Sequence, residues 1–219
     1  MFETIWQRRV QGAVAEPVHG RVLAAYNTNV DAIVHVTPEK LTKWLAEAPE
    51  LDWNRVEEGS IGDVKTIVTL EDFFIVLFDR LAKGKSFHIV LQGEEIVDWL
   101  QRVVGAEKES MGGQAGIVAN QMAYLGADAL CYTSLLSSQQ AALFHEKVKV
   151  PVVEDGQLKI LPAPAAAKDR LTKINWILEY AKDEVFTVGS REIVTPRANR
   201  VILATRPKEA IMGFQEDMV

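Results

Sequence analysis

The spacing of apolar residues changes along the 219-residue chain at about position 148. Before that position, apolar stripes at helical spacing alternate with short apolar runs, which predicts helices alternating with strands. The predicted strands cover 22–26, 33–36 and 129–133, and the predicted helices cover 39–48, 71–83, 94–104, 113–125 and 137–147. This alternation predicts an α/β fold with a largely parallel sheet.

Strands predominate in the pattern from residue 148 onward. The predicted strands are 148–153, 158–161, 172–180, 184–188 and 200–205, and a further one starts at 210–212. In "KINWILEY", apolar and polar residues alternate with the single exception of Ile177, which is typical of a strand with one buried face. We expect this part to form a smaller antiparallel sheet or an edge of the main sheet.

The composition is that of a globular protein with an acidic balance. Hydrophobic residues make up 48% and charged residues 25%, with 24 Lys and Arg against 30 Asp and Glu, a net charge of −6. This balance argues against a nucleic-acid partner. No apolar stretch reaches the roughly 18 residues of a membrane span, so we expect a cytoplasmic protein with no membrane partner. The single cysteine, Cys131, supports neither a disulfide framework nor a metal cluster, and we expect it to be buried.

The first candidate for chemistry is "NTNVD", residues 27–31, at the end of the first predicted strand. Ligands of open α/β sheets bind at the carboxyl ends of strands. Asn29 and Asp31 share a face if the chain is extended, and a carboxylate with an amide can hold sugar hydroxyls. An Asx-type turn that only redirects the chain explains the same residues equally well.

The second candidate is "SMGGQAGIVANQMAYLGA", residues 110–127. Glycines at a helix start permit unusual backbone angles and close approach of a ligand to backbone N–H groups. Gly112, Gly113 and Gln114 therefore form a candidate binding wall. Tight packing of helix on strand also requires small residues here, and it is the favoured explanation for Gly116 and Ala119.

A third candidate is the pair Lys173 and Arg200, each of which opens a predicted strand. Two cations on neighbouring strands can clamp a phosphate. Solvated surface charge is the default alternative. The four histidines show no metal-ligand spacing.

The motifs "AYNTNVDAI", "MGGQAGIVAN", "KINWILEY" and "PRANRVI", in this order, resemble the archaeal-type ADP-dependent phosphofructokinase and glucokinase family. The resemblance extends from the first of these motifs to "GFQ" at 213–215. It implies a ribokinase-like α/β domain with a smaller β-rich lid, lid elements falling within 35–110 and 150–205, and a sugar bound between domain and lid. The chain resembles the N-terminal half of the family.

The resemblance also implies residue roles. Asn29 and Asp31 match sugar-binding residues, the 112–114 segment matches the contacts to sugar hydroxyls, and Lys173 and Arg200 match the holders of a 6-phosphate. The glucokinase branch carries a glutamate shortly after a "GK" pair. Here Gly84 and Lys85 are followed by "SFH", which favours fructose 6-phosphate, although Glu94 or Glu95 is an alternative counterpart.

In the family, the second half carries a "GxGD" motif, which supplies the catalytic base and the anion hole, and an "NxxE" motif, which organises magnesium. No "GxGD" string occurs in this sequence, and its one string with the "NxxE" spacing, "NRVE" at 54–57, lies in the first third of the chain, so neither motif is assigned here. Mg²⁺ and ADP are expected cofactors of a complete enzyme, and we expect this chain alone to bind neither tightly. No catalytic residue is assigned, and the isolated chain is expected to be inactive. The alternative is a non-catalytic subunit that binds a sugar phosphate and serves regulation or assembly. An open sheet edge also predicts self-association or pairing with a missing half.

Overall fold

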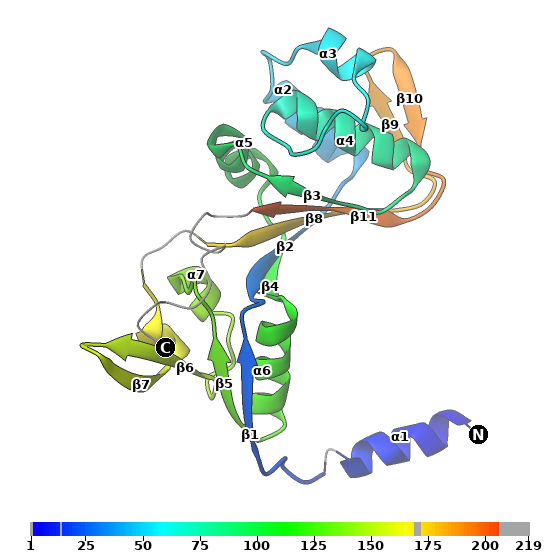
Figure 1. The fold of residues 1–219 in the computed structure, drawn as a ribbon. Coiled ribbons are helices and arrows are strands. Elements are labelled where there is room, and N and C mark those ends of the chain that lie inside the picture. The colour runs from blue at the N-terminus through cyan, green and yellow to red at the C-terminus, as the bar shows by residue number, and fades with distance from the viewer. Residues whose placement is uncertain (1, 14, 169–171, 206–219) are drawn as a thin grey trace. The chain divides into compact units, whose positions relative to one another are not determined.

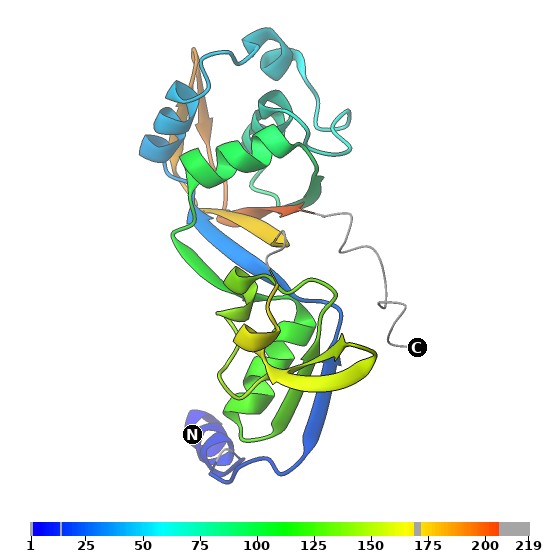
Figure 2. The same ribbon diagram turned by 90° about the vertical axis from the view of Figure 1, so that its left-hand side faces the viewer.

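The computed structural model describes residues 2–13, 15–168 and 172–205, and they fall into two compact units (Figures 1 and 2). Unit 1 contains the described residues up to 30 and 111–172. Unit 2 contains 31–110 and the described residues from 173 onward. Each unit is therefore assembled from segments that are far apart in the sequence.

Unit 1 is built on a four-stranded sheet in the order β1-β5-β6-β7. β1 (Arg21–Ala25) is parallel to β5 (Asp128–Tyr132), and β5 is parallel to β6 (Lys149–Glu154). β7 (Gln157–Pro162) returns antiparallel to β6 in a hairpin (Figure 2). A sheet that is parallel at its β1 and β5 end places the carboxyl ends of these two strands at the same edge.

Helix α6 (Gln114–Tyr124) packs along β1 and β5 (Figure 1). Its buried face consists of small residues, which allow the helix backbone to approach the sheet closely. Cys131 lies in the same core and is fully buried, as expected. The buried members of this core are Ala24, Met111, Ala115, Ala119, Ala123, Ala129, Cys131, Leu136, Ala141, Phe144, Val148, Val150, Ala163 and Ala166.

Three shorter or more exposed helices complete unit 1: α1 (Phe2–Ala13), α7 (Ser138–Ala141) and α8 (Ala163–Ala166). The sequence predicts a helix from 137 to 147, but α7 ends at Ala141. The side chain of Asn120 explains the early end, because its Nδ2 donates to Leu143 O at 2.9 Å and its Oδ1 accepts from His145 N at 2.8 Å. These bonds occupy backbone groups that a continued helix would use.

Unit 2 is built on a five-stranded sheet in the order β3-β11-β8-β2-β4. β11 runs parallel to β3 on one side and antiparallel to β8 on the other. A separate two-stranded antiparallel hairpin pairs β9 (Val185–Val188) with β10 (Arg191–Val194), and it contacts the helices of this unit. The sheet strands are β2 (Asn29–His35), β3 (Phe87–Leu91), β4 (Lys108–Gly112), β8 (Ile174–Tyr180) and β11 (Asn199–Thr205).

The helices of unit 2 lie on one side of this sheet (Figure 1). They are α2 (Pro38–Ala46), α3 (Trp53–Glu58), α4 (Leu70–Lys83) and α5 (Glu94–Trp99), the last continuing into a π-helical turn over Leu100–Val104. Helix α4 begins with a capping box between Thr69 and Asp72 and ends at Gly84, whose φ of 57° is left-handed. These caps confirm the predicted helix and its terminal glycine.

The α/β class is confirmed. The sheet of unit 1 is largely parallel, with antiparallel β7 at its edge, whereas the sheet of unit 2 mixes parallel and antiparallel pairs. Strands β3, β4 and β10 were not predicted. The predicted strand at 33–36 begins earlier, at Asn29, so part of the polar motif is itself extended. The strand predicted to start at 210–212 lies outside the described residues. Within the described part of the chain, no helix is long and apolar enough to cross a bilayer.

Candidate functional site

The "NTNVD" and "GGQ" motifs touch each other in unit 1. The backbone N–H of Ala115 donates to Asn27 O at 3.0 Å. Gly113, with φ 74°, lies so close to this turn that a Cβ on it would be 2.3 Å from Asn27 O and 2.9 Å from Thr28 Cα. Only glycine fits such a position, so the fold brings two motifs more than eighty residues apart to one edge.

The same edge receives the residue that follows β5. Thr28 Oγ1 donates to Thr133 Oγ1 at 2.7 Å, and Thr133 Oγ1 donates to Leu135 O at 2.8 Å. The rings of Tyr26 and Tyr132, at the ends of β1 and β5, meet edge to face with centroids 5.6 Å apart. Thr133 was missed by sequence reasoning, although its place at the carboxyl end of a predicted strand is the signal that identifies such positions.

The candidate residues of this edge differ in exposure. Gln114 is the first residue of α6 and is exposed, whereas Gly112 is the buried last residue of β4. Asn29, the first residue of β2, is only 2% exposed. The packing role predicted for Gly116 is confirmed, because a Cβ there would lie 2.4 Å from the sulfur of Met111.

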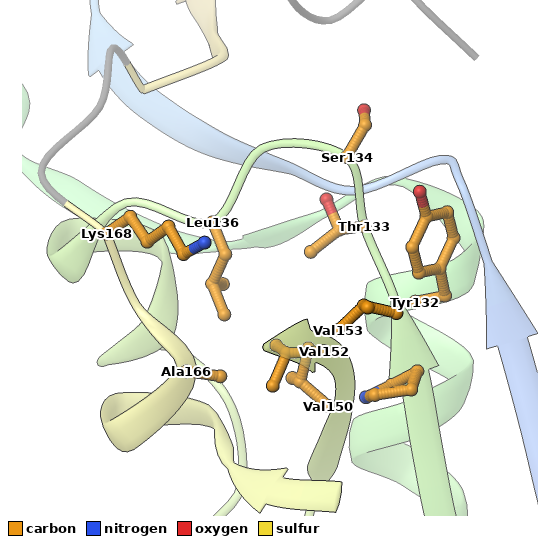
Figure 3. Close-up of a pocket in the computed structure, with 10 residues that line it drawn as sticks. Tyr132, Thr133, Ser134, Leu136, Val150, Val152, Val153, Ala166 and Lys168 are labelled. Atoms are coloured by element: carbon orange, nitrogen blue, oxygen red, sulfur yellow. The ribbon is translucent and has the colours of Figure 1, made fainter. Parts of the chain in front are cut away.

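A small cavity lies beside this edge, between the loop after β5 and strand β6 (Figure 3). Its volume is about 40 Å³, and Tyr132, Leu136 and Val150 are among its lining residues. The hydroxyl of Ser134 points away from the valines, and the Lys168 side chain extends toward Leu136 (Figure 3). Sites for small organic ligands are usually larger than about 300 Å³, so this cavity does not itself accommodate a sugar.

In unit 2, Asp31 lies on the sheet face opposite to the helices. The burial alternates along β2, with Val30, Ala32 and Val34 buried on the helix side. The Nδ2 group of Asn175 on β8 donates to Asp31 Oδ1 at 3.4 Å. Lys173, half-buried and directly before β8, continues the alternation on the face that carries Asn175. A lysine and a carboxylate thus lie on one sheet face.

Lys173 and Arg200 belong to neighbouring antiparallel strands, but the register does not bring them together. Arg200 pairs directly with Glu179, and Lys173 lies six residues before Glu179 in the sequence. At roughly 3.3 Å per residue this is a separation of about 20 Å along the sheet. A shared phosphate would have to lie within about 4 Å of both cations. The register thus separates the two backbone positions, and a shared role of the two side chains stays a prediction.

Arg200 lies at the end of the sheet where a network of charged side chains gathers. His35 Nδ1 is 2.7 Å from Glu107 Oε2, and His35 Nε2 is 3.4 Å from Glu179 Oε2. Lys40 Nζ forms an ion pair with Glu107 and donates to His35 O at 2.9 Å. A cavity of about 550 Å³ opens here, lined by His35, Ser86, Glu179, Tyr180, Ala181, Ala198, Asn199 and Arg200.

Two groups near these sites have shifted pKa values. Burial raises the pKa of the Cys131 thiol to about 12, so it stays protonated and unreactive. Burial also raises the pKa of Tyr180, against the opposing charges of Arg80 and Arg197. Among the described residues, no three His, Cys, Asp or Glu side chains gather as metal ligands, and we assign none of them a role in holding Mg²⁺.

Unit 1 has a sheet flanked by a helix that starts at glycines, and unit 2 is rich in strands. These features are those of part of a ribokinase-like α/β fold. Residues 20–219 match the model of the ADP-specific phosphofructokinase/glucokinase conserved region. The chain belongs to this family.

Curated relatives and solved structures agree with this assignment. The ADP-specific phosphofructokinase of Methanosarcina acetivorans is 34% identical over 198 residues, which are 89% of this chain and 40% of the relative. The ADP-dependent glucose/glucosamine kinase of Pyrococcus furiosus is 27% identical over 205 residues, which are 92% of this chain and 43% of the relative. A structure of a hypothetical ADP-dependent phosphofructokinase from Pyrococcus horikoshii superposes with a TM-score of 0.78 at 30% identity, covering 93% of this chain and 44% of that one.

A fourth similar protein has been solved with ligands. It is described as an ADP-dependent kinase complex with fructose-6-phosphate and ADPβS, and it superposes with a TM-score of 0.70 at 29% identity. The match covers 97% of this chain and 42% of that one. The chain thus spans about two fifths of the length of the proteins it matches.

Proposed function

We propose that this chain is the sugar-binding portion of an ADP-dependent sugar kinase that acts on fructose 6-phosphate. In the complete enzyme, ADP would donate its terminal phosphoryl group to the sugar's 1-hydroxyl, giving AMP and fructose 1,6-bisphosphate with Mg²⁺ as cofactor. The observation that carries the proposal is the direct contact of the two sugar motifs, in which Ala115 N donates to Asn27 O at 3.0 Å. The acidic composition supports a cytoplasmic location.

Each unit carries candidate sugar-binding residues of its own. In unit 1, Asn29 and the segment 112–114 would contact sugar hydroxyls, with Gln114 exposed at the helix start. In unit 2, the carboxylate of Asp31 would accept from two hydroxyls, and the amide of Asn175 orients it through the bond at 3.4 Å. Lys173, on the same face, would hold the substrate phosphate. Arg200, about 20 Å away along the strands, remains a second predicted phosphate contact.

The preference for fructose 6-phosphate over glucose rests on two observations. Relatives named ADP-specific phosphofructokinases reach 35% identity, whereas the glucose/glucosamine kinase reaches 27%. The residues after Gly84 and Lys85 include no acid before β3 begins at Phe87. Isothermal titration of the chain with fructose 6-phosphate and with glucose tests this preference. Tighter binding of glucose would contradict it.

Asp31→Asn tests the proposed site directly. The substitution keeps the size of the side chain and removes its charge, and we expect it to weaken fructose 6-phosphate binding at least tenfold. Asp155→Asn is a matched control, because Asp155 is exposed in the turn between β6 and β7. Equal affinity of the two variants would refute the role of Asp31.

We expect the chain alone to show no ADP-dependent turnover, because no "GxGD" sequence is found in it. The same observation supports the second candidate, a non-catalytic subunit that binds a sugar phosphate. Adding the remaining portion of a family member separates the two. Restored kinase activity supports the kinase portion, and sugar binding without restored activity supports the subunit.

We also propose that unit 1 associates with another polypeptide through the edge of its sheet. Strand β1 is at the end of the sheet order, and its Leu23 is 65% exposed. An exposed strand edge with apolar side chains favours pairing. The partner would be the remaining portion of the kinase or a second copy of this chain. Light scattering tests this, and a monomer across micromolar concentrations would contradict it.

A further inference from the structure

The backbone makes an unusual reversal directly after β1, at the start of the "NTNVD" motif. Tyr26 has a φ of 76°, in the left-handed region that a bulky aromatic residue rarely adopts. The N–H of Asn27 donates to Ala25 O at 3.1 Å and closes a three-residue γ-turn around Tyr26. Thr28 N donates to Tyr26 O at 3.0 Å and closes a second one. A γ-turn with a positive central φ is rare and strained, so contacts from outside must hold the segment 26–28 in place.

Strand β5 and the loop that follows it supply two of these contacts. Tyr26 N donates to Tyr132 O at 2.9 Å, which extends the pairing of β1 with β5 up to the turn. Thr28 is only 3% exposed, and its hydroxyl donates to Thr133 Oγ1 at 2.7 Å. Thr133 Oγ1 donates in turn to Leu135 O at 2.8 Å. The Thr133 hydroxyl therefore connects the turn to the loop after β5.

Helix α6 lies against the other side of the turn. Ala115 N donates to Asn27 O at 3.0 Å. A Cβ on Gly116 would lie 3.6 Å from Cγ2 of Thr28, so the helix backbone is close to the turn there as well. The bonds from Tyr132 and Ala115 use backbone atoms, which a substitution leaves in place. The bond from Thr133 uses a side chain, and a single substitution removes it.

The loop that carries Thr133 is incompletely packed on its far side. The cavity of about 40 Å³ lies between this loop and β6, and Thr133, Ser134 and Leu136 are among its lining residues (Figure 3). Lining atoms of a cavity lack packing partners across it. Packing alone therefore leaves this loop room to shift, and its bond to the turn restricts both segments.

We propose that Thr133 is a positioning residue of the sugar site. Its hydroxyl holds the strained segment 26–28, and this segment sets the position of Asn29, which follows it directly and is 2% exposed. Thr133 thus acts on sugar affinity through the turn, without contacting the sugar itself. The identity of the ligand rests on the proposed function, whereas the effect of Thr133 on the turn is a property of the chain alone.

Two substitutions at Thr133 test its effect on binding. Thr133→Val removes the hydroxyl and should weaken fructose 6-phosphate binding in isothermal titration about fivefold, the effect of one hydrogen bond of ordinary strength. Thr133→Ser keeps the hydroxyl and should retain the wild-type affinity. Equal affinities of the valine and serine variants would overturn the proposal, because the hydroxyl would then have no role in binding.

Thr69→Val is the matched control for a loss of stability without a loss of position. Thr69 is half-buried like Thr133, and its hydroxyl accepts from Asp72 N at 3.3 Å at the start of α4 in unit 2. This variant should unfold at lower urea concentration and bind fructose 6-phosphate as tightly as the wild type. If it weakens binding as much as Thr133→Val does, the effect of Thr133 is one of general stability and the inference fails.

Hydrogen exchange followed by NMR measures the turn with no ligand present. In Thr133→Val, the amides of Thr28 and Ala115 should exchange about fivefold faster relative to the amide of Leu125, which is bonded at the far end of α6. Their relative rates should be unchanged in Thr69→Val. Unchanged relative rates in Thr133→Val would overturn the proposal.

The two measurements separate this inference from the proposed function. If the wild type binds fructose 6-phosphate and Thr133→Val changes both affinity and exchange, both proposals stand. If the wild type binds no sugar but the turn amides of Thr133→Val exchange faster, the proposed function fails and the positioning of the turn by Thr133 stands. If exchange is faster while fructose 6-phosphate binds with full affinity, the turn does not set the geometry of the site and the inference fails.

Discussion

Substitution of Gly113 by alanine should destabilise unit 1 by more than the cost of its unusual backbone angles alone. Gly113 has φ 74° and ψ 143°, and its Cβ would lie 2.3 Å from the backbone oxygen of Asn27. This region of backbone space is nearly restricted to glycine and costs other residues about 1–3 kcal/mol. A contact with backbone atoms cannot be relieved by a rotamer change, and overpacking adds about 1–3 kcal/mol. The expected loss is therefore about 2–6 kcal/mol.

Gly105 provides a matched control for this substitution. Its φ is 60° and its ψ is 143°, close to the angles of Gly113, but a Cβ there would meet no atom within 4 Å. Gly105→Ala should therefore cost only the backbone penalty of about 1–3 kcal/mol. The difference between the two variants measures the contact with the Asn27–Thr28 turn.

Urea unfolding followed by far-UV circular dichroism gives the two free energies. Hydrogen exchange of the Ala115 amide, which donates to Asn27 O at 3.0 Å, reports the local effect. This amide should exchange faster in Gly113→Ala than in Gly105→Ala. If both variants lose the same stability and protect Ala115 equally, the close approach of the two motifs is refuted.

Three further predictions concern the cores and caps. Thr69→Ala removes the acceptor for Asp72 N in the capping box of α4 and should cost about 1 kcal/mol in urea unfolding; an unchanged midpoint would contradict the cap. The pKa of Cys131 is raised by burial from 9.0 to about 12, so its contribution to stability is complete below pH 9 and is lost as pH rises toward 12. Between pH 9 and 10.5 the free energy of unfolding of the wild type should fall by about 2 kcal/mol more than that of Cys131→Ala, at about 1.4 kcal/mol per pH unit. Equal decreases in the two proteins would show that the thiol does not titrate in this way. Tyr180→Phe removes the hydroxyl that contacts Arg80 O at 3.0 Å and Lys85 O at 3.1 Å, and it should lower the free energy of unfolding by about 1 kcal/mol; a stability equal to that of the wild type would mean that water replaces the bond.

Helix α4 shows what local sequence determines. A helix over 71–83 is predicted by the apolar stripe, the acids in the first turn and Gly84. The helix in the structure covers Leu70–Lys83. All of these signals act within a few residues of the chain, so no distant partner is needed to interpret them. The packing role of Gly116 followed from the same kind of reasoning.

The sequence pattern does not indicate which distant strands pair, or in which register. Strand β4 reads "KESMG", which has no apolar alternation, and it is a strand because it lies beside β2. The distance between Lys173 and Arg200 depends on the register of β8 and β11, and no residue near either cation encodes that register. The predicted helix at 137–147 failed for a related reason, since Asn120, far back in the chain, binds the backbone at Leu143 and His145.

The strand order of unit 2 has a consequence for the nascent chain. Strands β2, β3 and β4 leave the ribosome first, but in the sheet β3 is joined to β2 only through β11 and β8. Until residues 174–205 have been synthesised, β3 therefore lacks its sheet neighbour β11, and β2 has only β4 beside it. Over that interval the apolar strands β2 and β3 have open edges, and such edges favour misassociation. Chaperone demand during synthesis should fall sharply once Thr205 has emerged.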